Sequence, residues 1–481
     1  MSSALLDFYR CPEGLIQTGI SGALSADSRH FYFGRDTLCY GQIAGLPANC
    51  AGPNGFPDVY QTVSVRGSSV RLPFDPSQIV ENLRRERYMG KGYVGRRDVA
   101  SGPLIRDIYY LFRPFMSVAV RKHLQRFALR RWKQLPFPEW PVDTTVERLL
   151  ERLLILCMKA QNLDEMPFIW FWPEGASSCA IVTHDVETQA GLGFIPTLMD
   201  IDESADIPAS FQIVPQKQYL TSRATVDMIR DRGFELNVHD LSHDGELFRN
   251  KENLLRGAVL VNRYLQELGA GGFRSARMHR NADWFDAFEM AYDMSIPNVA
   301  HLEPQRGGCC TVFPYFIGAV LELPLTTCED YSLFHILGDY SIRLWKTQMA
   351  LIRARHGLIS ILVHPDYLDG NPRGLLAYGE LLDHLVCLRE SDRLWIAAPG
   401  DVNSWWRERS QMKLVPENGH WRITGQGHAR ARIAYLSVEG DRVVYRVDGQ
   451  RSFASPLSQN GDCVTKISLG GCRNLAQTID K

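Results

Sequence analysis

The sequence contains no CxxC pair, although it has 11 cysteines among its 481 residues. Thiolate zinc sites use such paired spacings, and disulfide frameworks are typical of small secreted chains. The cysteines are scattered singly, apart from the adjacent Cys309 and Cys310. We therefore expect free thiols in a reducing compartment.

Long apolar runs and a leader-like beginning are also missing. No stretch reaches the roughly 18 consecutive apolar residues that span a bilayer. The first ten residues, MSSALLDFYR, contain neither a basic region nor an apolar segment of signal-peptide length. These absences predict a cytoplasmic protein that is at most peripheral at the inner membrane surface.

The chain has no excess of charge of one sign. Its 53 lysines and arginines nearly cancel its 54 aspartates and glutamates, which gives a formal net charge of -1. Because dedicated nucleic-acid binders are usually basic overall, we do not expect nucleic acid as a partner. A hydrophobic content of 45% also excludes a largely disordered chain.

One segment departs strongly from this balance. Residues 84–133 contain 14 lysines and arginines against three acidic residues, a local excess of 11 positive charges. Aromatic and aliphatic residues are interspersed at helical spacing, which is typical of an amphipathic helix lying on an anionic membrane surface. In the alternative interpretation, the arginines are solvated or paired with another part of the protein.

Changes of composition along the chain predict four parts. Residues 1–83 form an irregular region that contains β-strands, and residues 84–140 form a basic amphipathic helical connector. Residues 141–410 alternate between strand and helix patterns, and residues 411–481 form a small β module. Within this last part, the turn Glu439-Gly440-Asp441 separates two strand-like runs, as in a β-hairpin.

The alternating part has the pattern of an α/β barrel. Apolar runs of strand length recur at residues 179–183, 209–214, 234–238, 271–275, 320–325, 358–363 and 394–397. Helical patterns lie between most of them and are clearest at residues 247–268, 342–355 and 375–388. Apolar strands alternating with helices indicate a parallel sheet covered on its faces. Seven such repeats favour a closed or nearly closed barrel.

Unusual polar residues stand where four of these strands end. In an α/β barrel, the carboxyl ends of the strands form the face that carries the active site. The four strand ends carry Thr183-His184-Asp185-Val186-Glu187, His239-Asp240-Leu241-Ser242-His243-Asp244, Arg274-Ser275-Ala276-Arg277 and His364-Pro365. Core packing alone does not explain charge or imidazole at four separate strand ends.

Two of these groups could bind a metal ion together. His239 and His243 are four residues apart, a separation at which both rings on a helix face or helix-entry turn can ligate one ion. Asp185 and Glu187 are two residues apart on one strand end, so their side chains lean to the same side. One carboxylate could bind metal while the other faces a reacting water. His184 projects to the opposite face, and we interpret it as structural.

The order of these motifs resembles the polysaccharide deacetylases of the NodB type, which belong to carbohydrate esterase family four. The resemblance covers residues 175–400 and implies a distorted (β/α)7 barrel. It departs from the family at Val186, which stands where many members have a second aspartate, and at Glu187, which replaces an aspartate. Ala276 also stands where the family has a proline.

Carried over residue by residue, the resemblance implies a role for each motif. Asp185 would be the general base, and Glu187, His239 and His243 would bind a divalent metal ion, with Zn²⁺ as the first expectation. Arg274 would orient the catalytic carboxylate, and His364 would be the general acid. Asp293 would tune that histidine.

The implied reaction is removal of the acetyl group from an N-acetylated sugar or glycan intermediate in cell-surface polysaccharide biosynthesis. Two alternatives stay open at this point. The altered first motif is compatible with a catalytically inactive carbohydrate-binding relative, and related barrels hydrolyse amides that are not sugars.

Overall fold

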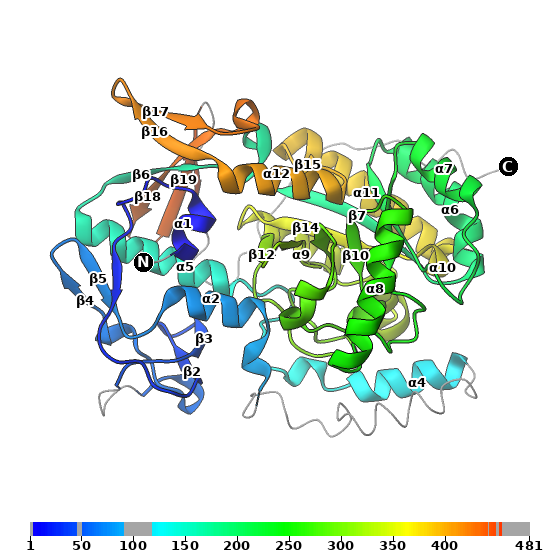
Figure 1. The fold of residues 1–481 in the computed structure, drawn as a ribbon, viewed down its shortest axis with the longest axis horizontal. Coiled ribbons are helices and arrows are strands. Elements are labelled where there is room, and N and C mark those ends of the chain that lie inside the picture. The colour runs from blue at the N-terminus through cyan, green and yellow to red at the C-terminus, as the bar shows by residue number, and fades with distance from the viewer. Residues whose placement is uncertain (1–2, 46–50, 91–117, 441, 449–451, 455–481) are drawn as a thin grey trace.

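The computed structural model describes residues 3–45, 51–90, 118–440, 442–448 and 452–454. A curled central sheet with its helices lies beside a second region built from the N-terminal residues and the C-terminal strands (Figure 1). Residues 91–117, the middle of the predicted basic segment, fall outside the described residues. Within the described part, all eight cysteines are free, as predicted.

The central sheet contains nine strands. Eight of them follow the order β12-β13-β11-β10-β9-β8-β7-β14, and β15 pairs with the first residues of β7. All neighbouring strands run parallel except β12, which is antiparallel to β13. The strands are β7 Cys179–Val186, β8 Ala209–Ile213, β9 Glu235–His239, β10 Gly272–Arg274, β11 Tyr292–Asp293, β12 Tyr315–Ile317, β13 Val320–Glu322, β14 Leu358–Leu362 and β15 Trp395–Ile396.

The sheet curls until its two ends approach each other, which confirms the predicted distorted barrel. At the seam, threonine hydroxyl groups contact the backbone of β14. Thr326 Oγ1 donates to Leu358 O at 2.7 Å and accepts from Ser360 N at 2.8 Å. Thr327 Oγ1 donates to Ser360 O at 2.8 Å. Side-chain hydrogen bonds therefore join the segment after β13 to β14.

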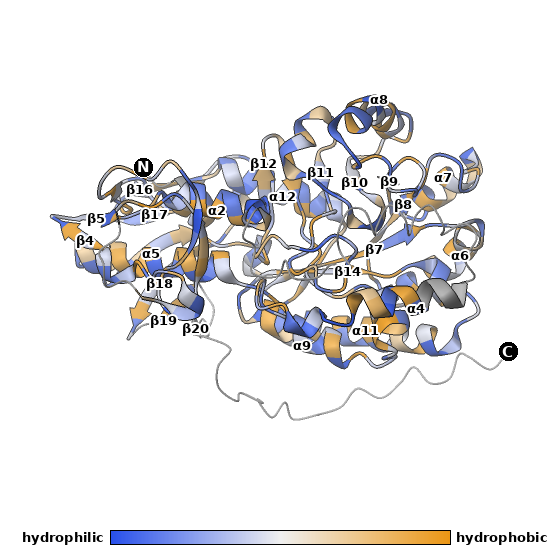
Figure 2. Cartoon of the chain, turned by 90° about the horizontal axis from the view of Figure 1, so that it is seen from below, coloured by the Kyte–Doolittle hydropathy of each residue, from blue (hydrophilic) through white to orange (hydrophobic). Residues whose placement is uncertain are grey.

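Helices surround the strands, with α8 on one side and α9 and α11 on the opposite side (Figure 2). Capping side chains stabilise the first turns of two of these helices. Thr188 accepts a hydrogen bond from Ala190 N at the start of α6, and Asn250 accepts one from Asn253 N at the start of α8. Across the described residues, none of the helices is both long and apolar enough to cross a membrane. The helices are α6 Gln189–Ser204, α7 Arg223–Asp231, α8 Lys251–Glu267, α9 Arg343–Arg353, α10 Pro365–Leu368, α11 Pro372–Asp392 and α12 Pro399–Gln411. The short turns are η7 Pro173–Gly175, η8 Ala276–Met278, η9 Ala282–Ala287 and the π-helical η10 Ser332–Leu337.

The N-terminal region is irregular and contains short strands. Strand β1 pairs with β5, which also pairs with β4, and β2 pairs with β3. Its elements are α1 Ser3–Tyr9, β1 Thr18–Ile20, β2 Arg29–Tyr32, β3 Leu38–Gly41, η1 Pro53–Gly55, η2 Tyr60–Thr62, β4 Ser64–Arg66, β5 Ser69–Leu72, α2 Pro76–Arg84 and η3 Arg87–Met89. The described elements that link it to the barrel include α4 Val118–Leu129, η6 Trp132–Gln134 and α5 Thr145–Gln161.

The C-terminal strands form the predicted hairpin around Gly440, and they recruit an earlier strand. Strand β18 pairs antiparallel with β19 on one side and with β6 on the other, so the sheet order is β20-β19-β18-β6. The elements are β6 Glu165–Ile169, β16 Lys413–Glu417, β17 His420–Thr424, η11 His428–Arg430, β18 Ile433–Glu439, β19 Arg442–Val447 and β20 Ser452–Ala454. A strand that precedes the barrel in sequence thus ties the C-terminal sheet to the rest of the protein.

A buried arginine fastens these regions together. Arg409, on α12, donates from Nε to Trp170 O at 2.9 Å and from Nη2 to Phe8 O at 2.9 Å and Ile169 O at 2.7 Å. Burial lowers the pKa of its guanidinium to about 9. Backbone carbonyls from α1, β6 and the following segment therefore converge on one cation, which satisfies them inside the core.

Glu147, in the first turn of α5, leads to a stability prediction. Its carboxylate accepts a hydrogen bond from Thr311, and burial raises its pKa from 4.5 to about 7. Because this pKa is higher in the folded state, Glu147 favours folding below its unfolded pKa and loses that contribution as pH rises to about 7. The loss amounts to about 3 kcal/mol of unfolding free energy. Glu147→Gln should gain about this much relative to the wild type between about pH 4.5 and pH 7 in urea unfolding, and parallel pH profiles would contradict the prediction.

Candidate metal centre and active site

The strand-end residues come together at one edge of the sheet. Strand β7 is buried along its whole length and delivers Asp185, and Glu187 follows directly after it. Strand β9 ends at His239, which is in register with Arg274 of β10. His364 follows β14, the other neighbour of β7. Parallel pairing thus aligns the carboxyl ends that carry these side chains.

A buried ion pair holds Asp185. Arg274 Nη1 donates to Asp185 Oδ1 at 2.8 Å, and both side chains are at most 2% exposed. Arg274 also donates to Thr183 Oγ1 and, through Nε, to Met294 O, so the guanidinium is fixed in place. Burial alone would raise the pKa of Asp185, but the charges of Arg274 and His239 outweigh it and lower the pKa. Asp185 is therefore ionised near neutral pH.

Glu187, His239 and His243 form the cluster that could hold a metal ion, because one ligand atom from each lies within 4.8 Å of the others. The Glu187 Oε1 atom lies 2.8 Å from His243 Nε2. Burial opposes ionisation of Glu187, yet the neighbouring His243 lowers its pKa below the usual value. The longer glutamate side chain, which replaces the aspartate of the resembled family, thus reaches the histidine pair.

The histidines of this cluster fit a metal ion. The Nδ1 atom of His239 is 3.1 Å from the carbonyl oxygen of Arg274, and its buried Nε2 has no hydrogen-bond partner. A carbonyl that accepts from Nδ1 leaves the lone pair of Nε2 available as a ligand. Two imidazoles and one carboxylate form a donor set suited to zinc and to related divalent ions.

The two histidines meet by a route that differs from the expected one. The sequence spacing suggested one helix face or a helix-entry turn, which is wrong: His239 ends β9, and α8 begins only at Lys251. Between them the chain folds back through positive φ values at Asp240 (53°) and His243 (42°). This brings the ring centroids of the two histidines to 5.2 Å.

The partner of His364 is Asp330, and the assignment of this role to Asp293 was wrong. Asp330 Oδ1 lies 2.6 Å from His364 Nδ1, and its Oδ2 accepts from His364 N at 2.8 Å. Asp293 instead accepts from Ser295 N at 2.9 Å and from the Ser295 hydroxyl at 2.8 Å. Burial lowers the pKa of His364, but Asp330 and Glu187 raise it well above the usual value.

Sequence reasoning missed Asp330 although a weak signal was available. Asp330 opens the helical turn that continues as η10, eight residues beyond the end of β13 and therefore farther from its strand than the other site residues. Tyr367 was also missed; its hydroxyl donates to Glu187 Oε2 at 3.1 Å. His184 is structural, as predicted, because it bonds to Val363 O and Asp202 behind β7.

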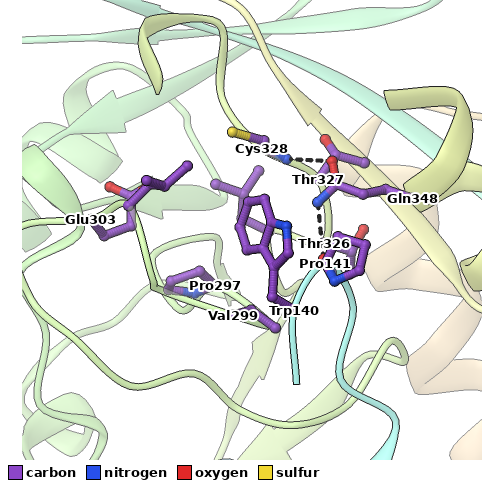
Figure 3. A pocket seen from close by; sticks show the side chains of 11 residues that line it. Trp140, Pro141, Pro297, Val299, Glu303, Thr326, Thr327, Cys328 and Gln348 are labelled. Atoms are coloured by element: carbon purple, nitrogen blue, oxygen red, sulfur yellow. Dashed lines mark hydrogen bonds between the residues drawn. The ribbon is translucent and has the colours of Figure 1, made fainter. Parts of the chain in front are cut away.

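A small cavity is lined by residues of the segment that leads to Asp330 and by Glu303 (Figure 3). Its wall includes Cys328, which lies two residues before Asp330 in the chain. The backbone N–H of Cys328 donates to Gln348 Oε1 at 3.0 Å. Glu303 also lines the cavity, and burial raises the pKa of its carboxyl group to about 7. The lining residues are Trp140, Pro141, Pro297, Val299, Leu302, Glu303, Leu325, Thr326, Thr327, Cys328 and Gln348.

Comparison with known proteins gives structural neighbours only, because no family model and no curated protein sequence matches the chain. A Mycobacterium smegmatis protein assigned to the polysaccharide deacetylases has 18% identity, with 52% of this chain and 98% of that chain covered and a TM-score of 0.41. A Bordetella bronchiseptica protein assigned as a polysaccharide deacetylase of O-antigen biosynthesis has 20% identity, coverages of 49% and 86%, and a TM-score of 0.29. The peptidoglycan deacetylase PdaC from Bacillus subtilis has 13% identity, coverages of 50% and 95%, and a TM-score of 0.29.

The structural neighbours, which match about half the chain at low identity, thus include polysaccharide deacetylases and members of carbohydrate esterase family four. They include a pseudoenzyme of that family whose mutant has restored activity.

Proposed function

We propose that the protein is a metal-dependent deacetylase of N-acetylated sugars or glycans. One observation carries this proposal: the carboxylate of Asp185 and the imidazole of His364 lie on either side of one cluster of atoms that could ligate a metal ion. Asp185 Oδ2 lies 3.7 Å from His239 Nε2, and His364 Nε2 lies 3.8 Å from Glu187 Oε1. A base and an acid on either side of a Lewis-acid site suit hydrolysis of an amide.

Each side chain then has a part in the reaction. A divalent cation held by Glu187, His239 and His243, with zinc as our first candidate, would polarise the acetyl carbonyl group. Asp185 accepts a proton from the attacking water. His364 donates a proton to the departing amine, which leaves as a free amino sugar together with acetate.

Two residues position these groups without touching the substrate. Arg274 holds the carboxylate of Asp185 and, through its carbonyl oxygen, the ring of His239. Asp330 holds the ring of His364 and stabilises its protonated form. We propose a glycan intermediate of cell-surface polysaccharide assembly in the cytoplasm as the substrate class.

Acetate release tests this function directly. Purified protein with zinc should release acetate from N-acetylated nucleotide sugars or lipid-linked glycans, and chelation should stop the release. Protein that binds no metal and releases no acetate, but still retains glycans, would favour the alternative of an inactive carbohydrate-binding relative. Faster release from N-acetylated amides that carry no sugar would favour the amidohydrolase alternative.

The assignment of Asp330 is tested by a matched pair of variants. Asp330→Asn should lower the rate of acetate release by about 100-fold or more, because the imidazole of His364 loses its orienting carboxylate. Asp293→Asn should have the smaller effect, since Asp293 bonds to Ser295 and not to His364. Metal content, measured for both variants, should stay at the wild-type level. A larger loss of acetate release for Asp293→Asn than for Asp330→Asn would mean that Asp293, and not Asp330, supports His364.

A further inference from the structure

The helix α4 and the turn after it present an exposed basic face to solvent. From residue 118 to residue 138 the chain contains six lysines and arginines and no acidic residue. Arg126, Arg130, Arg131 and Lys133 are exposed, and none of them forms an ion pair with an acidic side chain in the part of the chain that the structure describes. We call this surface the α4 face; its described residues are His123, Leu124, Arg126, Phe127, Arg130, Arg131 and Lys133.

Apolar side chains lie in the middle of the α4 face. Phe127 is 53% exposed and Leu124 is 37% exposed, and their spacing of three residues puts them on one side of the helix. The guanidinium of Arg130 lies 3.8 Å from the centre of the Phe127 ring. Exposed aromatic and aliphatic side chains surrounded by unpaired cations are typical of helices that lie in a membrane interface.

The α4 face is connected to the candidate active site. Arg126 Nε donates to His335 O at 2.7 Å, and the Tyr331 hydroxyl donates to Gln125. Tyr331 directly follows Asp330, the partner of His364. The rings of Tyr331 and His335 each lie 5.2 Å from the ring of Tyr367, which donates to Glu187.

These contacts place α4 beside the π-helical turn η10, on the side of the site that carries His364. In Figure 1, α4 runs along the lower edge of the barrel. A surface that touches α4 would therefore lie close to the metal cluster as well.

We propose that the α4 face binds an anionic lipid surface and thereby brings a lipid-linked N-acetylated glycan to the site. Charge complementarity selects this partner, because cationic side chains on an amphipathic helix are attracted by anionic headgroups while the apolar side chains enter the interface. A nucleic acid would satisfy the cations but leave Leu124 and Phe127 in water. The choice of a lipid-linked substrate rests on the proposed deacetylase function, whereas binding to lipid does not.

Two described arginines at the beginning of the basic segment 84–133 form ion pairs, unlike those of the α4 face. Arg85 and Arg87 both pair with Asp283, at 3.0 and 2.7 Å, so the beginning of the basic segment is neutralised within the protein. This is the alternative that the sequence left open, and it holds for these two arginines. Among the described residues of the segment, the solvent-exposed cations without an ion pair belong to the α4 face.

Sedimentation with vesicles tests the proposal on the full chain. The protein should bind vesicles of phosphatidylcholine with about one-third phosphatidylserine, and binding should weaken as salt rises. The double variant Arg130→Glu and Arg131→Glu should lower the partition coefficient at least about tenfold. Phe127→Ala, which keeps every charge, should also weaken binding, and thermal unfolding should show that both variants are folded.

A matched control comes from α8, which also exposes apolar residues and arginines. There Arg256 pairs with Glu252 at 3.7 Å and Arg263 pairs with Glu267 at 2.6 Å, beside the exposed Leu255 and Val259. Arg256→Glu together with Arg263→Glu should leave vesicle binding unchanged.

The proposal that the α4 face binds lipid would be overturned by no binding to the vesicles, by binding that salt does not weaken, or by equal losses of binding for the α4 and α8 variants. Binding to duplex DNA without binding to vesicles would also overturn it, in favour of nucleic acid. Vesicle binding without acetate release would refute the proposed deacetylase function but would still support lipid binding by the α4 face. Acetate release from soluble substrates without vesicle binding would refute lipid binding by the α4 face but would still support the proposed deacetylase function.

Discussion

Replacing Asp185 by asparagine should lower the rate of acetate release by about 10²- to 10⁴-fold, the range that general-base catalysis contributes. Asparagine has nearly the same shape and can still accept a hydrogen bond from Arg274, but it cannot take a proton from water. Asp185 is not among the three clustered residues that could hold a metal ion, so the metal content should stay at the wild-type level. The loss should appear in kcat at saturating substrate.

The same substitution has a structural cost that the experiment has to separate from chemistry. Asp185 and Arg274 form an ion pair that is almost fully buried, and removing one partner of such a pair typically costs about 3–5 kcal/mol of stability. Asparagine keeps one hydrogen bond, so the cost should fall at or below that range. Rates of acetate release measured well below the unfolding temperature of the variant would report the loss of the general base without the effect of lower stability. Equal rates for folded variant and wild type would show that another group acts as base.

Much of the barrel is readable from the sequence because a buried parallel strand leaves a local signal. All seven apolar runs correspond to strands of the central sheet, and the three clearest helical patterns correspond to α8, α9 and α11. Asp185, His239, Arg274 and His364 stand directly at strand ends, so the topology alone brings them together. Their convergence could therefore be predicted from the order of strands and helices.

The rest of the site depends on loops, whose paths the sequence does not encode in a periodic pattern. His243 reaches His239 through residues with positive φ, and Asp330 reaches His364 from eight residues beyond β13. The two-residue strand β11 is too short to leave an apolar run, and it places Asp293 beside Ser295 instead of His364. Likewise, the pairing of β6 with β18 joins segments more than 260 residues apart, beyond the reach of any local signal.

His239→Ala should remove the metal ion as well as the activity. The Nε2 atom of His239, our candidate ligand atom, is buried without any hydrogen bond, and the ring is already oriented by the Arg274 carbonyl group. Loss of a ligand should exceed the roughly 10- to 100-fold loss of affinity that follows when only a supporting group is removed. Titration with zinc, followed by metal analysis after gel filtration, would measure the change independently of activity.

His364→Gln is the matched control, because it also removes a buried imidazole at the same edge of the sheet. His364 lies 3.8 Å from Glu187 Oε1 but is held by Asp330, outside the cluster of three ligating residues. This variant should keep its metal and lose acetate release, whereas His239→Ala should lose both. Wild-type metal affinity in both variants would contradict the ligand set, and the second histidine ligand would then have to be sought outside His239. Loss of metal in both would instead make His364 a ligand, and the proton donor to the departing amine would have to be another group.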